Sequence, residues 1–198
     1  GVNGGLVVFV ADDPGMHSSQ NEQDSRHYAI ASKVPMLEPA DSVEAKEFTK
    51  LAFELSEEYD TPVLLRMCTR IAHSQCAVEM CEPLAIEKKE YVKNPQKYIM
   101  APANAIRKHP VVEARSAALV EYAENCELNR AELADNKELG IITSGTCYQY
   151  VKEVFGDSVS VLKLGLVYPL PEKLLLDFAA KFDRVVVIEE LDPVIENH

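Results

Sequence analysis

The sequence predicts an α/β fold, with parallel sheets that have helices on both faces. Two observations support this prediction. Short runs of β-branched and other apolar residues alternate with longer stretches in which apolar residues recur every three or four positions. The alternation is clearest over residues 139–188, where strand, helix, strand, helix and strand follow one another. Connections of this kind favour a parallel sheet covered by helices.

The first half of the chain contains one strand, helix, strand unit. Residues 6–10 and 63–66 are apolar runs of strand length, and the continuous apolarity of the second run is typical of a strand buried on both faces. Between them, apolar residues share one face of a predicted helix over about 42–59. Asp41 can cap that helix, with Glu44 as the reciprocal partner of a capping box. The unit predicts a parallel strand pair.

Residues 73 to about 102 show no sustained periodicity, because charges, prolines and tyrosines are mixed there. We interpret this stretch as an ordered connector between two α/β units. The interpretation rests on four large side chains that we expect it to bury: Tyr91, Tyr98, Ile99 and Met100.

A further helix is predicted to run to about Cys126, with Pro110 either starting it or kinking it. The second α/β unit follows. Its predicted strands cover residues 139–143, 159–164 and 184–188, and its predicted helices cover residues 147–155 and about 172–182.

Composition excludes several classes of protein. The 198 residues include 20 Lys and Arg against 32 Asp and Glu, which gives a formal net charge of −12. Nucleic acids and anionic membrane surfaces require clustered cations, so neither is an expected partner. No apolar run approaches the roughly 20 residues that cross a bilayer. The five cysteines are odd in number and irregularly spaced, which favours a reduced, cytoplasmic protein.

Both ends of the sequence are abrupt. The chain opens on Gly1 without a methionine, directly before the first predicted strand, and only ten residues follow the last strand. We expect both ends to be cut from a longer chain. A processed start on a complete domain would give the same pattern.

The loop after the first strand is the first candidate site, because ligands of open parallel sheets gather at the carboxyl ends of the strands. Residues 12–24 contain carboxylates, hydroxyls, amides and one imidazole. Their spacing matches no nucleophile elbow, phosphate loop or metal motif. On spacing alone, a solvated loop with Asx caps is the favoured interpretation.

Two other strand ends are polar. Residues 144–146 stand where a strand meets a helix, and they could either bind an anion or form an ordinary N-cap, which is the favoured alternative. Glu189 and Glu190 follow the last strand and could supply a carboxylate to a partner or ligand, or only cap the strand end.

No metal site is predicted. His73, Cys76 and Cys81 have an unusual spacing for zinc and no fourth ligand nearby. The other cysteines lie in apolar contexts and are interpreted as core residues: Cys68, Cys126 and Cys147.

Two longer motifs point to a family. The first reads GVNGG at residues 1–5 and VADDPGMHSSQNEQDSR at residues 10–26; the second reads KLGLVYPLPEKL at residues 163–174 and VIEELDP at residues 187–193. Both closely resemble the α subunits of the indolepyruvate ferredoxin oxidoreductases, which belong to the thiamine-diphosphate-dependent 2-oxoacid:ferredoxin oxidoreductases. The resemblance covers almost the whole chain, in order.

The resemblance implies a domain organisation and an activity. Residues 1–75 would be the later part of a pyrimidine-binding domain, residues 76–135 a connector with a long helix, and residues 136–198 a domain like the carboxyl-terminal domain of transketolase. Enzymes of the family decarboxylate a 2-oxo acid on thiamine diphosphate and transfer the acyl group to coenzyme A. Two electrons pass through 4Fe-4S clusters to ferredoxin, and the partner in an oligomeric assembly is a β subunit.

The resemblance also implies that this chain lacks parts of the enzyme. The activating glutamate would precede Gly1, and the domains that bind diphosphate with Mg and the iron–sulfur clusters would follow His198. We therefore expect the chain alone to be inactive, with no catalytic residue, no metal ligand and no bound cofactor of its own.

The candidate cofactor-binding residues lie in the polar loop, and they are His17, Ser18, Ser19, Asn21 and Gln23. They would form an active-site wall that faces the cofactor or an adjoining subunit. The alternative is a structural, subunit-docking module without a catalytic role. A complete small-ligand enzyme would require turnover by this polypeptide alone.

Overall fold

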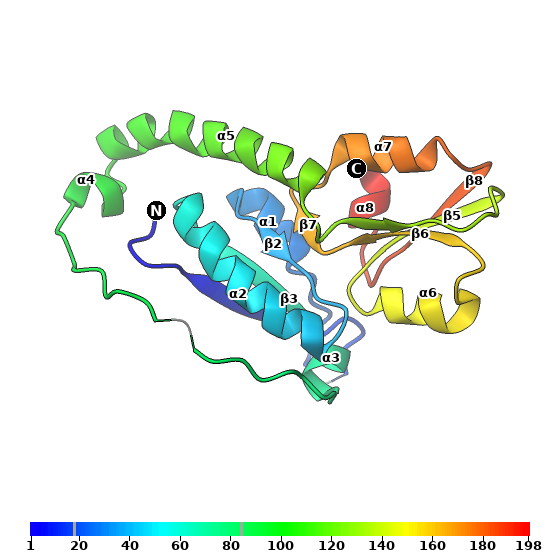
Figure 1. Cartoon of the computed structure of the whole chain (residues 1–198). Helices are drawn as coiled ribbons and strands as arrows, with labels where there is room; N and C mark the ends of the chain where they lie inside the picture. The colour runs from blue at the N-terminus through cyan, green and yellow to red at the C-terminus, as the bar shows by residue number, and fades with distance from the viewer. Residues whose placement is uncertain (18, 84) are drawn as a thin grey trace.

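The computed structural model describes residues 1–17, 19–83 and 85–198. Two four-stranded sheets lie side by side, with helices packed on them (Figure 1). The elements of the first half are β1 (Val7–Asp12), α1 (Arg26–Ser32), β2 (Met36–Leu37), α2 (Ser42–Glu58), β3 (Val63–Cys68), α3 (Thr69–His73), α4 (Pro95–Tyr98) and α5 (Pro102–Asn125). Those of the second half are β4 (Arg130–Glu132), β5 (Leu139–Ser144), α6 (Cys147–Phe155), β6 (Ser160–Leu164), β7 (Leu166–Tyr168), α7 (Glu172–Ala179), β8 (Arg184–Ile188) and α8 (Val194–Asn197).

The first sheet has the strand order β1-β3-β2-β7. β1 and β3 are parallel over their whole length, with Val7 opposite Val63 and Asp12 opposite Cys68, which confirms the predicted parallel pair. The connecting helix α2 begins after Asp41, whose carboxylate accepts the backbone N–H of Glu44. The Glu44 side chain returns to the backbone N–H of Ala40, one residue before the position that a standard capping box uses.

The second sheet has the order β4-β6-β5-β8, in which β5, β6 and β8 are parallel and β4 is antiparallel. α6 and α7 cover opposite faces of this sheet (Figure 1). Each strand and helix expected over residues 139–188 is present. The predicted fold class is therefore confirmed, with an antiparallel strand added to each sheet.

Sequence analysis missed seven short elements of the described residues: α1, β2, α3, α4, β4, β7 and α8. β2 has two residues and β4 and β7 have three each, which is too short for a periodicity to show. β7 follows β6 in the chain but pairs antiparallel with β2 in the first sheet. The predicted domain boundaries stay a prediction, and one strand of the later half completes the earlier sheet.

The apolar core is shared between the two halves. One cluster brings Ala29 and Met36 from the first half against Leu162, Leu164 and Phe178 from the second. Burying these side chains removes apolar area from water and holds the two sheets together. The sheets are therefore fixed relative to each other by packing as well as by the chain.

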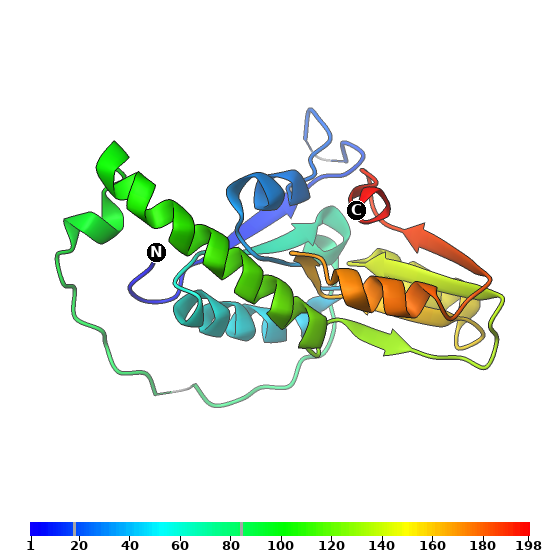
Figure 2. The same cartoon turned by 90° about the horizontal axis from the view of Figure 1, so that it is seen from above.

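The connector differs from the expectation. Outside residue 84, residues 74–94 contain no helix or strand and form a wide arc at one side of the molecule (Figures 1 and 2). The predicted burial is wrong, because Tyr91 is 74% and Ile99 59% exposed, with Tyr98 and Met100 also exposed. The arc and the short helix α4 that follows it lie away from both sheets (Figures 1 and 2), so neither sheet offers an apolar face to these side chains. The following helix α5 contains Pro110 inside it rather than at its start.

Among the described residues, no helix combines the length and the apolarity needed to cross a membrane.

Candidate functional site

The carboxyl ends of the strands of the two sheets meet at one place in the molecule. The Cys68 thiol, at the end of β3, lies 3.4 Å from the Thr146 hydroxyl, which follows β5. Gly145 packs against Glu38, which follows β2, so closely that a Cβ there would lie 2.6 Å from a carboxylate oxygen of Glu38. Ligands of parallel sheets bind at such edges, and here two edges adjoin.

A buried arginine, Arg66 of β3, organises this edge. Its Nε donates to the carboxylate of Asp12 at 2.6 Å and its Nη1 donates to Glu38, while Asp24 lies 3.7 Å away. Burial would lower the pKa of Arg66, but the neighbouring carboxylates raise it overall. The guanidinium therefore stays charged in the interior, where it compensates carboxylates that would be costly to bury alone.

A second buried arginine, Arg26 at the start of α1, joins the two halves. Its guanidinium binds Asp24 at 2.6 Å and Glu189 at 2.5 Å, and it donates to the backbone carbonyls of Glu190 and Asp192. Glu189 also accepts backbone N–H groups at the start of α8. Of the two alternatives for this glutamate, the structure supports capping, because its oxygens are already bonded within the chain.

The polar loop between β1 and α1 is pinned at both ends by buried carboxylates. Asp12 accepts the backbone N–H of Ser25 at 2.7 Å and its hydroxyl at 2.5 Å. Asp13 accepts the backbone N–H groups of His17 at 3.1 Å and Ser19 at 2.6 Å, and the hydroxyl of Thr69 at 2.7 Å. The first turns of the loop are thus held to β1 and to the end of β3.

The candidate residues lie on this pinned loop. His17 and Asn21 are exposed, and Ser19 and Gln23 are half-buried. The Ser19 hydroxyl donates to the carbonyl of Asn21 at 2.7 Å. Ser18 lies outside the described residues. Their role toward a cofactor stays a prediction, and the described four lie in the loop that follows the carboxyl end of β1.

The turn at residues 144–146 does neither of the things considered for it. Thr146 makes no side-chain cap to α6, since its hydroxyl lies 3.3 Å from Glu190 and close to Cys68 instead. The expected N-cap is therefore wrong, because the hydroxyl has a tertiary partner. The carboxylates of Glu38 and Glu190 both adjoin the turn, so an anion would be repelled there.

The cysteines at this edge are inert. Cys68 and Cys147 are buried, as predicted, and Cys126 is half-buried. Burial raises the pKa of the Cys147 thiol to about 12, and the charge of Glu190 adds to the effect. A thiol with so high a pKa is neither a nucleophile nor a metal ligand at neutral pH.

The described residues contain one group of three potential metal ligands, and it is not the one considered from the sequence. His73, Cys76 and Cys81 are exposed, whereas Asp24, His27 and Asp192 have ligand atoms within 4.8 Å of one another. The carboxylate of Asp24 already binds the guanidinium of Arg26. That positive charge competes with a cation, so we assign no metal to the group.

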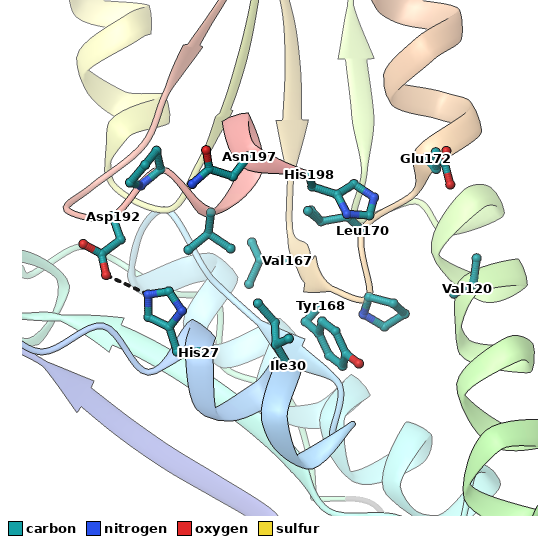
Figure 3. A pocket seen from close by; sticks show the side chains of 13 residues that line it. His27, Ile30, Val120, Val167, Tyr168, Leu170, Glu172, Asp192, Asn197 and His198 are labelled. Carbon is teal, nitrogen blue, oxygen red and sulfur yellow. Dashed lines mark hydrogen bonds and ion pairs between the residues drawn. The ribbon is translucent and has the colours of Figure 1, made fainter.

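A separate cavity of about 620 Å³ lies between α1, α5, the segment around Pro169 and α8 (Figure 3). Its lining is largely apolar and includes Ile30, Val167 and Leu170. His27 and Asp192 form a 2.6 Å contact at one end of it (Figure 3). None of the four described candidate residues of the polar loop lines this cavity.

Thiamine diphosphate, which the family resemblance implies, is not fitted by these residues alone. Activation of its aminopyrimidine ring requires a carboxylate, but Asp12, Asp24 and Glu38 each bind an arginine. The second oxygen of Glu38 has no hydrogen-bond partner in the described part of the chain, yet it is buried. The carboxylates of Asp12, Asp24 and Glu38 are thus committed to arginines, so we derive no step through the cofactor.

Comparison with known proteins identifies relatives along the whole chain. No family model matches it. The indolepyruvate oxidoreductase subunit IorA of Methanothermobacter marburgensis is 45% identical over 202 residues, and that of Thermococcus kodakarensis 42% over 206 residues. Each alignment covers 99% of this chain and 32% of the relative, so the chain spans about a third of the length of the curated relatives it matches.

Among solved structures, a 2-oxoglutarate:ferredoxin oxidoreductase from Magnetococcus marinus superposes with a TM-score of 0.60 over 91% of this chain and 40% of that chain. At 15% identity this likeness concerns the fold alone. The fold, the order of the motifs and the sequence identity agree with one another. Over its whole length, this chain is therefore similar to about one third of the length of the indolepyruvate oxidoreductase IorA subunits.

Proposed function

We propose that this chain forms one wall of the active site of a thiamine-diphosphate-dependent 2-oxoacid:ferredoxin oxidoreductase that acts on indolepyruvate or a related arylpyruvate. The reaction would be the oxidative decarboxylation of the 2-oxo acid to an acyl-CoA, with two electrons passed to ferredoxin. Thiamine diphosphate, Mg and 4Fe-4S clusters would be held largely by parts of the assembly outside this sequence. The partners would be a β subunit, ferredoxin, coenzyme A and the 2-oxo acid, and a cytoplasmic location stays a prediction.

The observation that carries the proposal is the anchoring of the polar loop. Its backbone is bonded to the buried carboxylates of Asp12 and Asp13, while its side chains at His17 and Asn21 are exposed. A site needs side chains that are accessible to a ligand and a backbone that does not move when the ligand binds. A loop that was only a solvated connection would have no need for two buried carboxylates beneath it.

The proposal is tested in the native protein, isolated with the subunits that accompany it. Asn21→Ala and Gln23→Ala are expected to lower the rate of indolepyruvate-dependent ferredoxin reduction at saturating coenzyme A by at least about tenfold, the loss expected when a hydrogen bond to a charged or polar reactant is removed. Gln96→Ala, an exposed amide on α4, is the matched control and should leave the rate unchanged. Wild-type rates in both loop variants would contradict the proposal.

A second candidate function is favoured by a specific observation. The arc at residues 74–94 exposes large apolar side chains, among them Met80 at 87% and Ile86 at 81%. Exposed apolar groups gathered on one segment mark interaction sites. The alternative is therefore a subunit-docking module, in which the arc contacts a neighbouring subunit and the loop has no role in catalysis.

The two candidates predict opposite results for two variants. Under the docking alternative, Ile86→Ser weakens association with the accompanying subunits, as measured by sedimentation velocity, and Asn21→Ala leaves the turnover per assembled complex unchanged. Under the active-site proposal, Asn21→Ala lowers turnover in a complex that is fully assembled.

A third measurement tests the expected incompleteness of the site. Calorimetric titration of the 198-residue polypeptide with thiamine diphosphate and Mg²⁺ is expected to show no tight binding. Tight binding would overturn the proposal that other parts of the assembly hold the cofactor.

A further inference from the structure

A second polar cleft lies beside the polar loop, on the outer side of the β3 to α3 junction. It has a volume of about 380 Å³ and is lined by His17, Thr69, Arg70, His73 and Ser74. We call it the His17–Arg70–His73 cleft. Three of its five side chains are basic, and none is a carboxylate. In a chain whose net charge is −12, such a composition is unexpected for a random part of the surface.

The cleft is built from two elements that one carboxylate ties together. Asp13 accepts the backbone N–H of His17 on one side and the hydroxyl of Thr69 on the other. Gly15, at φ +94°, allows the His17 ring to fold back over it, and a Cβ at Gly15 would lie 3.3 Å from Nε2 of His17. The two walls of the cleft are therefore positioned relative to each other before any ligand arrives.

The basic groups of the cleft have no carboxylate within ion-pair distance in the described part of the chain. Arg70 stacks on the ring of Tyr150, with its guanidinium carbon 5.6 Å from the ring centroid, whereas Arg26, Arg66 and Arg130 each bind carboxylates. Stacking uses the face of a guanidinium and leaves the N–H groups in its plane free to donate. Arg70 is therefore oriented and still has its hydrogen-bonding capacity.

The nearby acids are already bonded elsewhere. The carboxylate of Asp13 accepts from the loop and Thr69, Asp41 caps α2 and accepts from Gln149, and Glu190 accepts from Thr146. They lower the local positive potential without occupying the donors of Arg70.

We propose that the His17–Arg70–His73 cleft binds a phosphate group of an anionic ligand. A phosphate group carries up to two negative charges and three strong acceptor oxygens, which match three donors that come from two elements and therefore from different directions. A carboxylate is planar and can be satisfied by one arginine in a bidentate pair. The volume of about 380 Å³ also leaves room for a phosphate with the group that carries it.

The test is equilibrium dialysis of radiolabelled inorganic phosphate against the native protein with its accompanying subunits, saturated beforehand with thiamine diphosphate and Mg²⁺. Arg70→Gln is expected to weaken one class of phosphate site by about tenfold to a hundredfold, the loss typical of a hydrogen bond between charged groups. His73→Gln should weaken the same class less. Arg184→Gln, an exposed arginine at the start of β8, is the matched control and should bind as the wild type does.

Competition distinguishes the sources of the phosphate. Displacement of the label by coenzyme A assigns the cleft to a nucleotide-linked phosphate, and displacement by inorganic pyrophosphate alone assigns it to a free anion; either result supports a phosphate cleft. Equal displacement by acetate would overturn the choice of phosphate over carboxylate. Wild-type phosphate binding in both Arg70→Gln and His73→Gln would overturn the proposal that this cleft binds phosphate.

This inference goes beyond the proposed function, and the two fail independently. Phosphate binding is measured without turnover, so an inactive loop does not affect it. Conversely, Asn21 and Gln23, which test the proposed function, do not line the cleft. Loss of phosphate binding in Arg70→Gln together with full activity in the Asn21 and Gln23 variants would support the phosphate cleft and contradict the proposed active-site role of the loop.

Discussion

Two irregular stretches of this molecule have opposite structural support. Residues 13–25 and residues 74–94, outside residues 18 and 84, contain no helix or strand and are rich in polar and charged side chains. The first stretch is bonded to the buried carboxylates of Asp12 and Asp13. The second is attached through exposed contacts such as the ion pair of Lys89 with Glu57, whose side chains are 50% and 40% exposed.

The difference shows that the absence of helix and strand does not decide whether a loop is held in one conformation. A loop is fixed when its backbone N–H groups have buried partners, because breaking such a bond leaves a polar group without water. An exposed ion pair contributes little, since water and salt compete for both charges. In the first stretch, exposed side chains on a fixed backbone are therefore placed to bind a ligand. In the second stretch, the exposed side chains are free to contact a partner.

The largest effect is expected from the arginine beneath the loop. Arg66→Met would leave Asp12 and Glu38 buried without their counter-charge, and breaking a buried ion pair in this way costs about 3–5 kcal/mol. Urea unfolding of the chain measures the loss. Arg184→Met, at an exposed position, is the control and should stay within about 0.5 kcal/mol of the wild type. A similar change in both variants would remove the distinction between buried and exposed anchoring.

A smaller effect is expected from the anchor within the loop. Asp13→Ala removes the acceptor of the His17 and Ser19 amides and of the Thr69 hydroxyl, and should lower the free energy of unfolding by about 1–3 kcal/mol. Thr69→Val removes one of these donors and should cost less. If Asp13→Ala and Thr69→Val lower the free energy of unfolding equally, the loop backbone does not depend on Asp13.

Acid should weaken the same region progressively. Burial by itself would raise the pKa of Asp24, but hydrogen bonds and charge from Arg26 and Arg66 lower it overall. Burial would likewise raise the pKa of Glu44, but the charge of Lys163 and its hydrogen bond lower it overall. A carboxylate whose pKa is lowered in the folded state stabilises the fold at every pH above its ordinary pKa, which is 3.8 for Asp24 and 4.5 for Glu44. This stabilisation is lost as the pH falls through the lower, folded-state pKa.

The urea midpoint should therefore be constant from pH 7 to about 5 and fall steadily below the ordinary carboxyl pKa range. A midpoint that does not change down to pH 3 would show that these carboxylates are unpaired in solution.

The smallest effect on stability is expected in the arc. Ile86→Ser changes a side chain that is 81% exposed and should alter the free energy of unfolding by no more than about 0.5 kcal/mol. A glutamate-specific protease should cut first within residues 74–94, at Glu79, Glu87 or Glu90, and later at Glu22 in the anchored loop. Mass spectrometry of early fragments decides this order, and an initial cut at Glu22 would reverse the comparison.

Much of the fold could be predicted because its elements are local. The helix after Asp41 has an N-cap and apolar residues on one face, and the strand, helix, strand pattern over 139–188 is long enough to show both periods. The connector was predicted wrongly at Tyr91 and Ile99, because an apolar side chain is buried only if another element lies against it. No local pattern reveals whether one does.

For the candidate site, which stays a prediction, the sequence indicated the loop but not the residues that support it. Ligands of parallel sheets bind at the carboxyl ends of the strands, which indicated the loop after β1, where His17, Ser19, Asn21 and Gln23 lie. Arg66 was passed over, although a single charge inside an apolar strand run is a signal that a buried counter-ion exists nearby. Arg26 gave no such signal, because its partner Glu189 lies 163 positions away in the chain.

The sequence by itself determined the longer helices, the longer strands and the resemblance to the IorA subunits, since each depends on residues close together in the chain or on whole motifs. Only the tertiary structure decided that the carboxyl ends of two sheets adjoin, that β7 completes the first sheet, and that two buried arginines hold the polar loop. The physical reason is that these contacts join residues far apart in the chain. Arg66 and Asp12 are 54 positions apart, and Arg26 and Glu189 are 163 positions apart. Such pairings are selected by packing and charge compensation in three dimensions, which no periodicity along the chain records.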